Sequence, residues 1–138
     1  MRRFRTAVLV LALATCAGYA NLSGAGAAAA GGAATFSGRV TRVVDGDTFR
    51  ISSADERIRI WALDAPEVGA PGGSQATAAL SALIAGKQLT CRQRDIDRYG
   101  RIVGQCFLPD GRDIAAAMIA SGMAREFCRY SGNHYRTC

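Results

Sequence analysis

Two short acidic motifs hold most of the side chains in this sequence that could do chemistry. The first is Asp-Gly-Asp at 45–47, and the second is Asp-Ala-Pro-Glu at 64–67. Arg59 precedes the second motif on the same apolar run. Hard cations such as Ca²⁺ prefer several oxygen ligands, and carboxylates supply them together with negative charge. An arginine beside such a cluster fits a third partner, a phosphate, between the cation and the guanidinium.

Taken alone, each motif is more often an ordinary turn, and Arg59 is more often a solvated strand residue. The pairing of the motifs favours a site, because both stand at the ends of adjacent predicted strands and folding brings them to one rim. Clustered carboxylates without a cation repel each other and raise each other's pKa, and a bound Ca²⁺ offsets that cost. We therefore take a Ca²⁺-dependent phosphodiesterase site as the working hypothesis.

Hydrophobic periodicity and turn residues predict the elements that must position these motifs. The predicted strands are 35–44, 48–52, 56–63, 87–94 and 101–108. One predicted helix runs from Ser74, its N-cap, to Gly86, and a second runs from 114 to 121 with Asp113 as its cap. Residues 123–138 are predicted to be irregular.

This order of elements is three strands, a helix, two strands and a helix. The first three strands form an antiparallel meander, and the whole is typical of a small closed Greek-key barrel, the OB-fold. The fold class is therefore predicted as mainly β with α (α+β): a five-stranded antiparallel OB-fold barrel with two helices. The sequence indicates neither an internal repeat nor a second domain.

The first 34 residues differ in composition from the rest. Arg2, Arg3 and Arg5 precede an apolar run at 7–14 that is too short to span a bilayer, and small residues follow. This pattern predicts a signal peptide over residues 1–20, with cleavage after Ala20 or later, up to about residue 34. A buried N-terminal helix is the alternative. Residues 21–34 are predicted to be a flexible Ala/Gly leader, and residues 35–138 the folded domain.

Cys16 leaves two forms of export open. Leu-Ala-Thr-Cys at 13–16 is close to a bacterial lipoprotein processing site, although Thr15 departs from the usual small residue. Lipidation at Cys16 would anchor the protein to a membrane. Otherwise the sequence predicts an exported bacterial protein, periplasmic or secreted.

Four cysteines remain in the predicted domain, and an even number in an exported chain favours two disulfides. Three pairings are possible. We favour Cys91–Cys106, because both lie in neighbouring predicted strands, and Cys128–Cys138, which would tie down the tail. A zinc site is disfavoured, because no CxxC spacing is present and the only histidine, His134, lies near the end.

The charge of the chain is mildly basic. The formal net charge is +6, and three of the positive charges lie in the predicted signal peptide. A basic balance suits a polyanionic partner such as nucleic acid.

Three segments together resemble the signature blocks of the thermonuclease (staphylococcal nuclease-like) family. They are 43–48, 58–67 and 97–101, and they occur in the family's order at fitting spacings. The resemblance extends over about residues 37–126. It implies an OB-fold barrel with helices that cleaves DNA and RNA with Ca²⁺.

The resemblance also implies roles for residues of the two motifs. Asp47 and Asp64 would bind Ca²⁺ by carboxylate, Ala65 would bind it by its backbone carbonyl, and Asp45 would lie just outside the ligand shell. Glu67 would be the general base that activates a water molecule.

Basic and aromatic residues would contact the substrate by the same resemblance. Arg59 and Arg101 would hold the scissile phosphate and stabilise charge on its oxygens. Arg98, Tyr99 and Tyr130 would contact the nucleotide.

The sequence therefore predicts an exported, monomeric, Ca²⁺-dependent nuclease acting on DNA, RNA or both, without a stable protein partner. One alternative is an OB-fold module that binds nucleic acid without cutting it. Another is a lipid-anchored envelope protein with a reused nuclease-like domain. The family's prototype continues into a third helix, and a Cys128–Cys138 bridge is expected to replace part of that packing.

Overall fold

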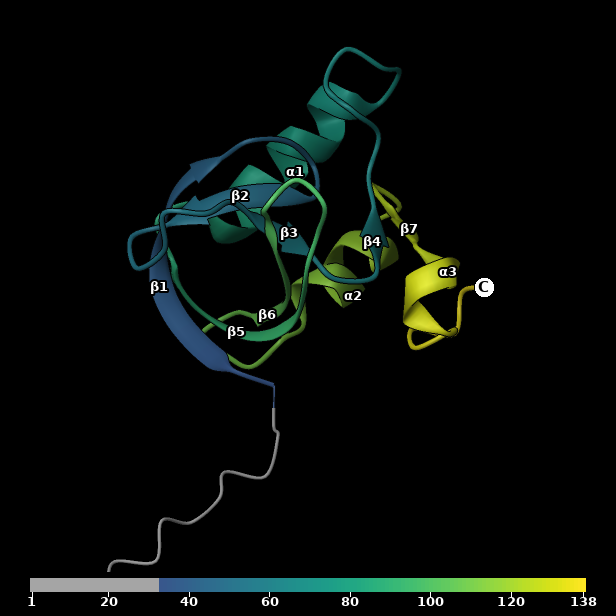
Figure 1. The fold of residues 1–138 in the computed structure, drawn as a ribbon. Coiled ribbons are helices and arrows are strands. Elements are labelled where there is room, and N and C mark those ends of the chain that lie inside the picture. The colour runs from purple at the N-terminus through teal and green to yellow at the C-terminus, as the bar shows by residue number, and fades with distance from the viewer. Residues whose placement is uncertain (1–32) are drawn as a thin grey trace, which may run out of the picture. The chain divides into compact units, whose positions relative to one another are not determined.

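The computed structural model describes residues 33–138 (Figure 1). The strands are β1 (Thr35–Val43), β2 (Thr48–Ile51), β3 (Ile58–Ile60), β4 (Leu63–Asp64), β5 (Gln88–Ile96), β6 (Ile102–Phe107) and β7 (Arg125–Glu126). The helices are α1 (Gly73–Ile84), α2 (Ile114–Ala120) and α3 (Cys128–Ser131). The predicted signal peptide, the leader as far as residue 32 and Cys16 lie outside the described residues and stay predictions.

Five strands close into a barrel in the order β1-β2-β3-β6-β5, which confirms the predicted OB-like fold class. The expectation of an entirely antiparallel barrel is wrong, because β3 and β6 run parallel. A closed ring with an odd number of strands cannot alternate direction all the way round, so one neighbouring pair must be parallel. That pair brings the start of β6, next to Arg101, alongside the start of β3, next to Arg59.

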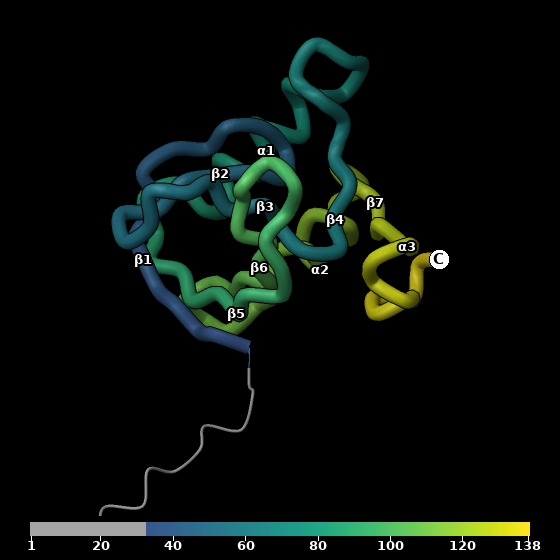
Figure 2. The backbone as a smooth tube through the Cα atoms, viewed as in Figure 1, coloured from purple at the N-terminus to yellow at the C-terminus, as the bar shows by residue number. Residues whose placement is uncertain are grey.

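The predicted strand over 56–63 is interrupted. Its first part, β3, stays in the barrel, and Ala62 then adopts a left-handed conformation with φ of 63°. Such a conformation is uncommon for a residue with a side chain and reverses the strand locally. The chain therefore leaves the barrel, and β4 pairs antiparallel with β7 in a separate two-stranded sheet. Figures 1 and 2 show β4, β7 and α3 together beside the barrel, next to α2.

The two predicted helices form, with one corrected cap. Asp113 caps α2 as expected, since its Oδ1 accepts a hydrogen bond from the backbone N–H of Ala116 at 3.2 Å. The N-cap of α1 is Gly72 and not Ser74, because Gly72 adopts a left-handed conformation (φ 85°) that Ser74 could not share cheaply.

A third helix corrects both the two-helix prediction and the irregular assignment of residues 123–138. This helix, α3, is a single turn, and the C-terminal part of the chain also supplies β7. Neither element has a hydrophobic period long enough to read from sequence, because both are held by contacts with distant segments.

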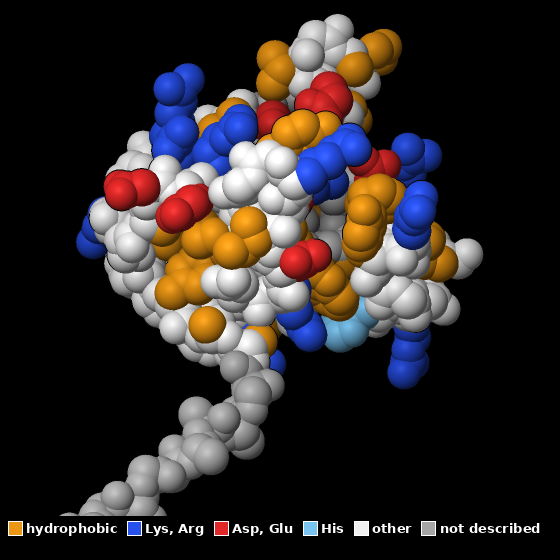
Figure 3. Space-filling model, viewed as in Figure 1, with side chains coloured by type: hydrophobic (Ala, Val, Ile, Leu, Met, Phe, Trp, Pro, Cys, Tyr) orange, Lys and Arg blue, Asp and Glu red, His pale blue; other side chains and the backbone are white. Residues whose placement is uncertain are grey.

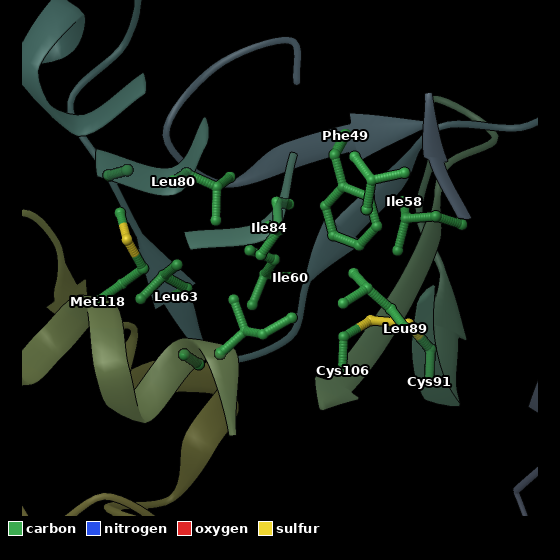
Figure 4. Packing of buried hydrophobic residues seen from close by; sticks show 14 of the residues in the cluster. Phe49, Ile58, Ile60, Leu63, Leu80, Ile84, Leu89, Cys91, Cys106 and Met118 are labelled. Atoms are coloured by element: carbon green, nitrogen blue, oxygen red, sulfur yellow. A yellow bond between two sulfur atoms is a disulfide. The ribbon is translucent and has the colours of Figure 1, made fainter. Parts of the chain in front are cut away.

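The core fills the barrel and its helical cover. Figure 4 shows Leu80 and Ile84 of α1 and Met118 of α2 pointing toward Ile60 and Leu63. All five side chains are almost completely buried. This packing fixes β3 and Leu63, the residue directly before the second acidic motif. No helix within residues 33–138 is long and apolar enough to cross a membrane.

Both favoured disulfide pairings are confirmed. Cys91–Cys106 joins β5 to β6 inside the core, where both cysteines are buried. Cys128–Cys138 links α3 to the last residue, and both of its cysteines are exposed.

Mild reduction under native conditions is expected to open Cys128–Cys138 while Cys91–Cys106 stays closed, because only the first bridge is accessible to a reductant. Opening it is expected to lower the free energy of unfolding by about 2–3 kcal/mol, since the unfolded chain regains the freedom that the bridge removes. Differential alkylation with peptide mass mapping, combined with thermal unfolding, measures both effects. An unchanged unfolding temperature after selective opening would contradict a stabilising role for this bridge.

Candidate active site

The first acidic motif forms the tight connection between β1 and β2. Within it, the Asp45 carboxylate accepts a hydrogen bond from the backbone N–H of Asp47 at 3.0 Å. The backbone carbonyl of Asp47 accepts one from the N–H of Ile60 at 2.8 Å. Asp47 is therefore fixed from both sides at the rim of the barrel, and Asp45 acts as a support for the turn.

The Asp47 carboxylate binds two neighbouring side chains. Its Oδ1 accepts a hydrogen bond from the hydroxyl of Thr48 at 2.8 Å, and its Oδ2 lies 2.7 Å from Nη1 of Arg59. Thr48 and Arg59 are cross-strand partners on β2 and β3, so the sheet register sets this ion pair. Sequence reasoning missed Thr48; its position directly after the acidic motif, at the start of a strand, was the available signal.

The second terminal nitrogen of the Arg59 guanidinium also has a hydrogen-bond partner. Its Nη2 donates to the backbone carbonyl of Leu63 at 3.3 Å. Arg59 thus links the first motif to the strand that leads into the second. A guanidinium carries five N–H donors, so three remain for a bound anion.

Burial raises the pKa of the Asp47 carboxyl from 3.8 to about 6. The Arg59 guanidinium and the Thr48 hydroxyl lower this pKa, the Asp45 carboxylate raises it, and the backbone of Ala65 lowers it again. Desolvation is the largest of these effects. The site therefore holds a carboxylate whose charge the protein alone does not fully compensate.

The second motif meets the first at Gly46. A Cβ on Gly46 would lie 2.7 Å from the Cβ atoms of both Ala65 and Ala76, closer than side-chain carbons approach. Only a glycine lets the first turn pack against Ala65 and the face of α1. This contact confirms that folding brings the two acidic motifs together.

The second motif opens into a groove of about 510 Å³. The groove is lined by Asp64, Ala65, Pro66, Glu67, Pro71, Gly122, Met123, Ala124 and Arg125. Glu67 is exposed there. Figure 3 shows acidic and basic side chains interleaved on the side of the molecule where β4 and β7 lie.

Arg125 is the groove residue that sequence reasoning missed. Its Nη2 lies 3.5 Å from Oδ2 of Asp64, and the two residues are register partners on β7 and β4. No local signal in the sequence points to this pair, because β7 is two residues long and pairs with a distant strand.

Arg101 lies directly before β6 and does not join the Asp47 ion pair. Its Nε donates to Oδ2 of Asp97 at 2.6 Å, and Oδ1 of Asp97 accepts from the N–H groups of Tyr99 and Arg101. Although burial acts in the opposite direction, these contacts with Arg101 and Tyr99 hold the pKa of Asp97 below its ordinary value. Arg101 is therefore anchored at the tip between β5 and β6, on the barrel edge next to β3.

The predicted nucleotide-contacting residues separate into two places. The guanidinium carbons of Arg98 and Arg101 lie 4.9 Å and 5.4 Å from the ring centre of Tyr99, whose side chain is largely exposed. Tyr130 lies elsewhere, on α3, where it packs edge-on against Phe127 at 4.8 Å. It is exposed and is not part of the groove lining.

The donor chemistry of the site fits a hard cation such as Ca²⁺. Asp47 and Asp64 offer carboxylate oxygens and Ala65 a carbonyl oxygen, and hard cations prefer such ligands. Within residues 33–138, no group of three or more His, Cys, Asp or Glu side chains could hold a metal ion. A cation here would therefore rely on backbone oxygen, water and substrate as well as on the two carboxylates.

A comparison with family models finds one match. The model described as staphylococcal nuclease homologue matches residues 57–137, which is more than half of the chain. The match includes Arg59, the second acidic motif, Arg101 and the C-terminal residues as far as 137. The first motif lies before it.

Individual relatives have related names. The chain is 40% identical over 96 residues to an uncharacterized endonuclease of Escherichia coli, covering 68% of this chain and 63% of that protein. It is 35% identical over 109 residues to a micrococcal nuclease of Shigella flexneri, covering 72% and 62%. It is also 40% identical over 93 residues to the succinoglycan biosynthesis protein ExoI of Rhizobium meliloti, covering 59% and 48%. The chain thus spans less than two thirds of each of these relatives.

The Gly46→Ala substitution is expected to destabilise the fold by about 1–3 kcal/mol, because the added methyl group overlaps Ala65 and Ala76. Gly46 does not adopt a left-handed conformation, so backbone strain does not contribute. Chemical unfolding measures the effect. Adding Ala65→Gly to this variant should recover part of the loss, and a purely additive double variant would show that the two motifs do not touch.

The Asp47→Asn substitution is expected to stabilise the metal-free protein at pH 8. A carboxyl whose pKa is raised by folding favours the folded state below its unfolded pKa, and this stability is lost as the pH rises through about 6. One pKa unit corresponds to about 1.4 kcal/mol, so the expected gain is about 1–3 kcal/mol. Thermal unfolding in chelator at pH 8 and at pH 4 measures it. A gain of equal size at both pH values would contradict this origin.

Proposed function

Because the chain belongs to the staphylococcal nuclease homologue family, we propose that it is an exported, Ca²⁺-dependent nuclease that hydrolyses phosphodiester bonds of DNA or RNA. The observation that carries this proposal is the contact between the two acidic motifs beside Arg59. It supports a site in which two candidate cation ligands, a guanidinium that can bind an anion and the Glu67 carboxylate act together.

Arg59 and Arg101 bind the scissile phosphate in this proposal. Arg59 has N–H donors left over from Asp47 and Leu63, and a guanidinium donates to two phosphate oxygens at once. Arg101 lies directly before β6, the strand next to β3, and its backbone N–H and Nε are fixed by Asp97. Both side chains are fixed before substrate arrives, which favours electrostatic stabilisation of the charge that develops on phosphate oxygens.

Glu67 takes the proton from the attacking water. Its carboxylate lines the groove and is exposed, so water and substrate can reach it. The water oxygen bonds to phosphorus while the bond from phosphorus to the leaving oxygen breaks. The leaving oxygen takes a proton from solvent water, and Glu67 then returns to solvent the proton that it accepted. Glu67 thereby supplies the general base that the reaction needs.

Asp47, Asp64 and the backbone carbonyl of Ala65 would hold the Ca²⁺, with Asp45 supporting the turn from outside the ligand shell. A bound Ca²⁺ supplies positive charge that orients the phosphate and offsets its negative charge. The desolvated carboxylate of Asp47 supports this assignment, because a cation would compensate its charge.

Tyr99 and Arg98 extend the substrate contacts beyond the scissile phosphate. The Tyr99 ring stands exposed beside two guanidinium groups and offers a stacking surface with positive charge next to it. Tyr130 on α3 is a more distant candidate. The basic formal charge of the chain agrees with a nucleic-acid substrate.

Export and a monomeric state complete the proposal. The N-terminal pattern of residues 1–20 and the two disulfides support an oxidising compartment, periplasmic or extracellular. Membrane attachment would require lipidation at Cys16. The intact mass of the exported protein distinguishes the two forms.

Oxidised protein is expected to cleave single-stranded DNA or RNA with Ca²⁺ and to stop when a chelator is added. Glu67→Gln is expected to lower the rate by about 10²–10⁴-fold through loss of the base. Arg59→Ala is expected to lower it by about 10²–10³-fold through loss of charge stabilisation. Fluorescence of a labelled oligonucleotide follows cleavage, and circular dichroism checks the fold.

Glu56→Gln and Arg42→Ala are matched controls, since both residues are exposed and, within residues 33–138, neither side chain is hydrogen-bonded or ion-paired to the two motifs. They should cleave at the unsubstituted rate. Binding of the oligonucleotide without Ca²⁺-dependent cleavage would replace the proposal with a non-catalytic binding module. A near-normal rate in Glu67→Gln or Arg59→Ala would remove the role given to that residue.

A further inference from the structure

We propose that Glu126 is a positioning residue for the candidate active site. Its carboxylate binds the C-terminal segment, defined as residues 127–138. Because Glu126 lies on β7, and β7 pairs with β4, these contacts keep β4 and Asp64 in place. The role of Asp64 as a cation ligand rests on the proposed function. The mechanical coupling between Glu126 and β4 rests on contacts alone.

The strand that carries Asp64 has left the barrel and depends on the C-terminal residues for its pairing. In the register of β4 and β7, Leu63 faces Glu126 and Asp64 faces Arg125. The backbone N–H of Phe127 donates to the carbonyl of Ala62 at 2.8 Å. Residues 62–64 are therefore held in their extended course by residues 125–127.

Glu126 itself is held by hydrogen bonds from the C-terminal segment. Its Oε1 accepts from the N–H of Tyr135 at 3.0 Å, and its Oε2 accepts from the N–H and the hydroxyl of Thr137, both at 2.9 Å. The side chain is buried, with 7% of the residue exposed. One carboxylate thus accepts three hydrogen bonds from two residues of the C-terminal segment.

The same segment is also held by three contacts that do not involve Glu126. Cys128–Cys138 closes it covalently, and the hydroxyl of Tyr135 donates to Asp113, the cap of α2, at 3.0 Å. The ring of His134 packs edge-on against Trp61 at 5.2 Å. Trp61 precedes the left-handed Ala62, so the segment contacts both Trp61 and Ala62 in the turn that leads to Asp64.

Glu126 is the central link of this arrangement. An apolar residue of similar size would fill the same space but would leave the N–H groups of Tyr135 and Thr137 without acceptors. The C-terminal segment would then no longer be held against β7. Because β7 is the pairing partner of β4, the position of β4 would become less fixed as well. The Glu126 carboxylate therefore links the disulfide-closed C-terminal segment, through β7, to the strand that carries Asp64.

The test compares Glu126→Ala and Glu126→Gln with the unsubstituted oxidised protein. Hydrogen exchange followed by mass spectrometry measures the protection of residues 61–67. We expect Glu126→Ala to speed exchange there at least about tenfold, while residues 88–107 of the barrel keep their protection. Glu126→Gln should show a smaller effect, because an amide retains one acceptor oxygen.

The second readout is the Ca²⁺ concentration that gives half of the maximal cleavage rate. We expect it to rise about tenfold or more in Glu126→Ala, with a smaller change in the rate at saturating Ca²⁺. Ile51→Val is the matched control, because Ile51 lies in the core on β2, and β2 pairs with β1 and β3 and not with β4 or β7. It should leave both readouts unchanged.

Unchanged exchange over residues 61–67 in folded Glu126→Ala would overturn the proposal. If that variant fails to fold, the double variant Cys128→Ser with Cys138→Ser releases the same segment and must show the same faster exchange, or the proposal fails. Absence of cleavage by the unsubstituted protein would refute the proposed function, and the exchange result would still decide the coupling.

Discussion

The ion pair between Asp47 and Arg59, 2.7 Å apart at the rim of the barrel, is the interaction on which the site depends. A carboxylate removed from water is costly unless charge and hydrogen bonds compensate it. Here the compensation comes from the neighbouring strand, because Thr48 and Arg59 are register partners. A shift of one residue between β2 and β3 would move Arg59 to the other face and leave Asp47 alone. The site therefore stays intact only if β2 and β3 keep their register in the barrel.

The parallel pair of β3 and β6 follows from the closure of five strands and also serves the site. It places the segment with Arg101 next to the segment with Arg59, on two strands that lie far apart in the sequence. A glycine completes the assembly from the other side, since Gly46 lets the first turn contact Ala65. The Arg101 segment thus reaches the Arg59 segment through strand pairing, and the first turn reaches the second motif through the steric contact at Gly46.

Much of this could be predicted from the sequence, and the failures have physical causes. Apolar patterns and turn residues predict the barrel strands, and the Asp113 cap and both disulfide pairings follow from local chemistry or from strand neighbours. The break at Ala62 could not be predicted, because alanine rarely adopts a positive φ and does so here only under tertiary contacts. Arg125 could not be predicted for a related reason. Its strand, β7, has only two residues and forms only because it pairs with the distant strand β4. The approach of the two motifs was inferred correctly, but the close contact at Gly46 that produces it was not.

Two buried acids show how the same chemistry can take opposite roles in one small domain. Burial raises the pKa of Asp47 to about 6, in spite of Arg59 and Thr48, so its charge remains in need of a further partner. Burial also acts to raise the pKa of Glu126, yet hydrogen bonds from Ser131, Tyr135 and Thr137 hold it at about 2. The donors around Glu126 come from the protein itself, so that charge is fully used in holding the C-terminal segment. The charge of Asp47 is not fully compensated by the protein. A carboxylate with uncompensated charge, beside an arginine that has N–H donors to spare, is therefore suited to bind a ligand.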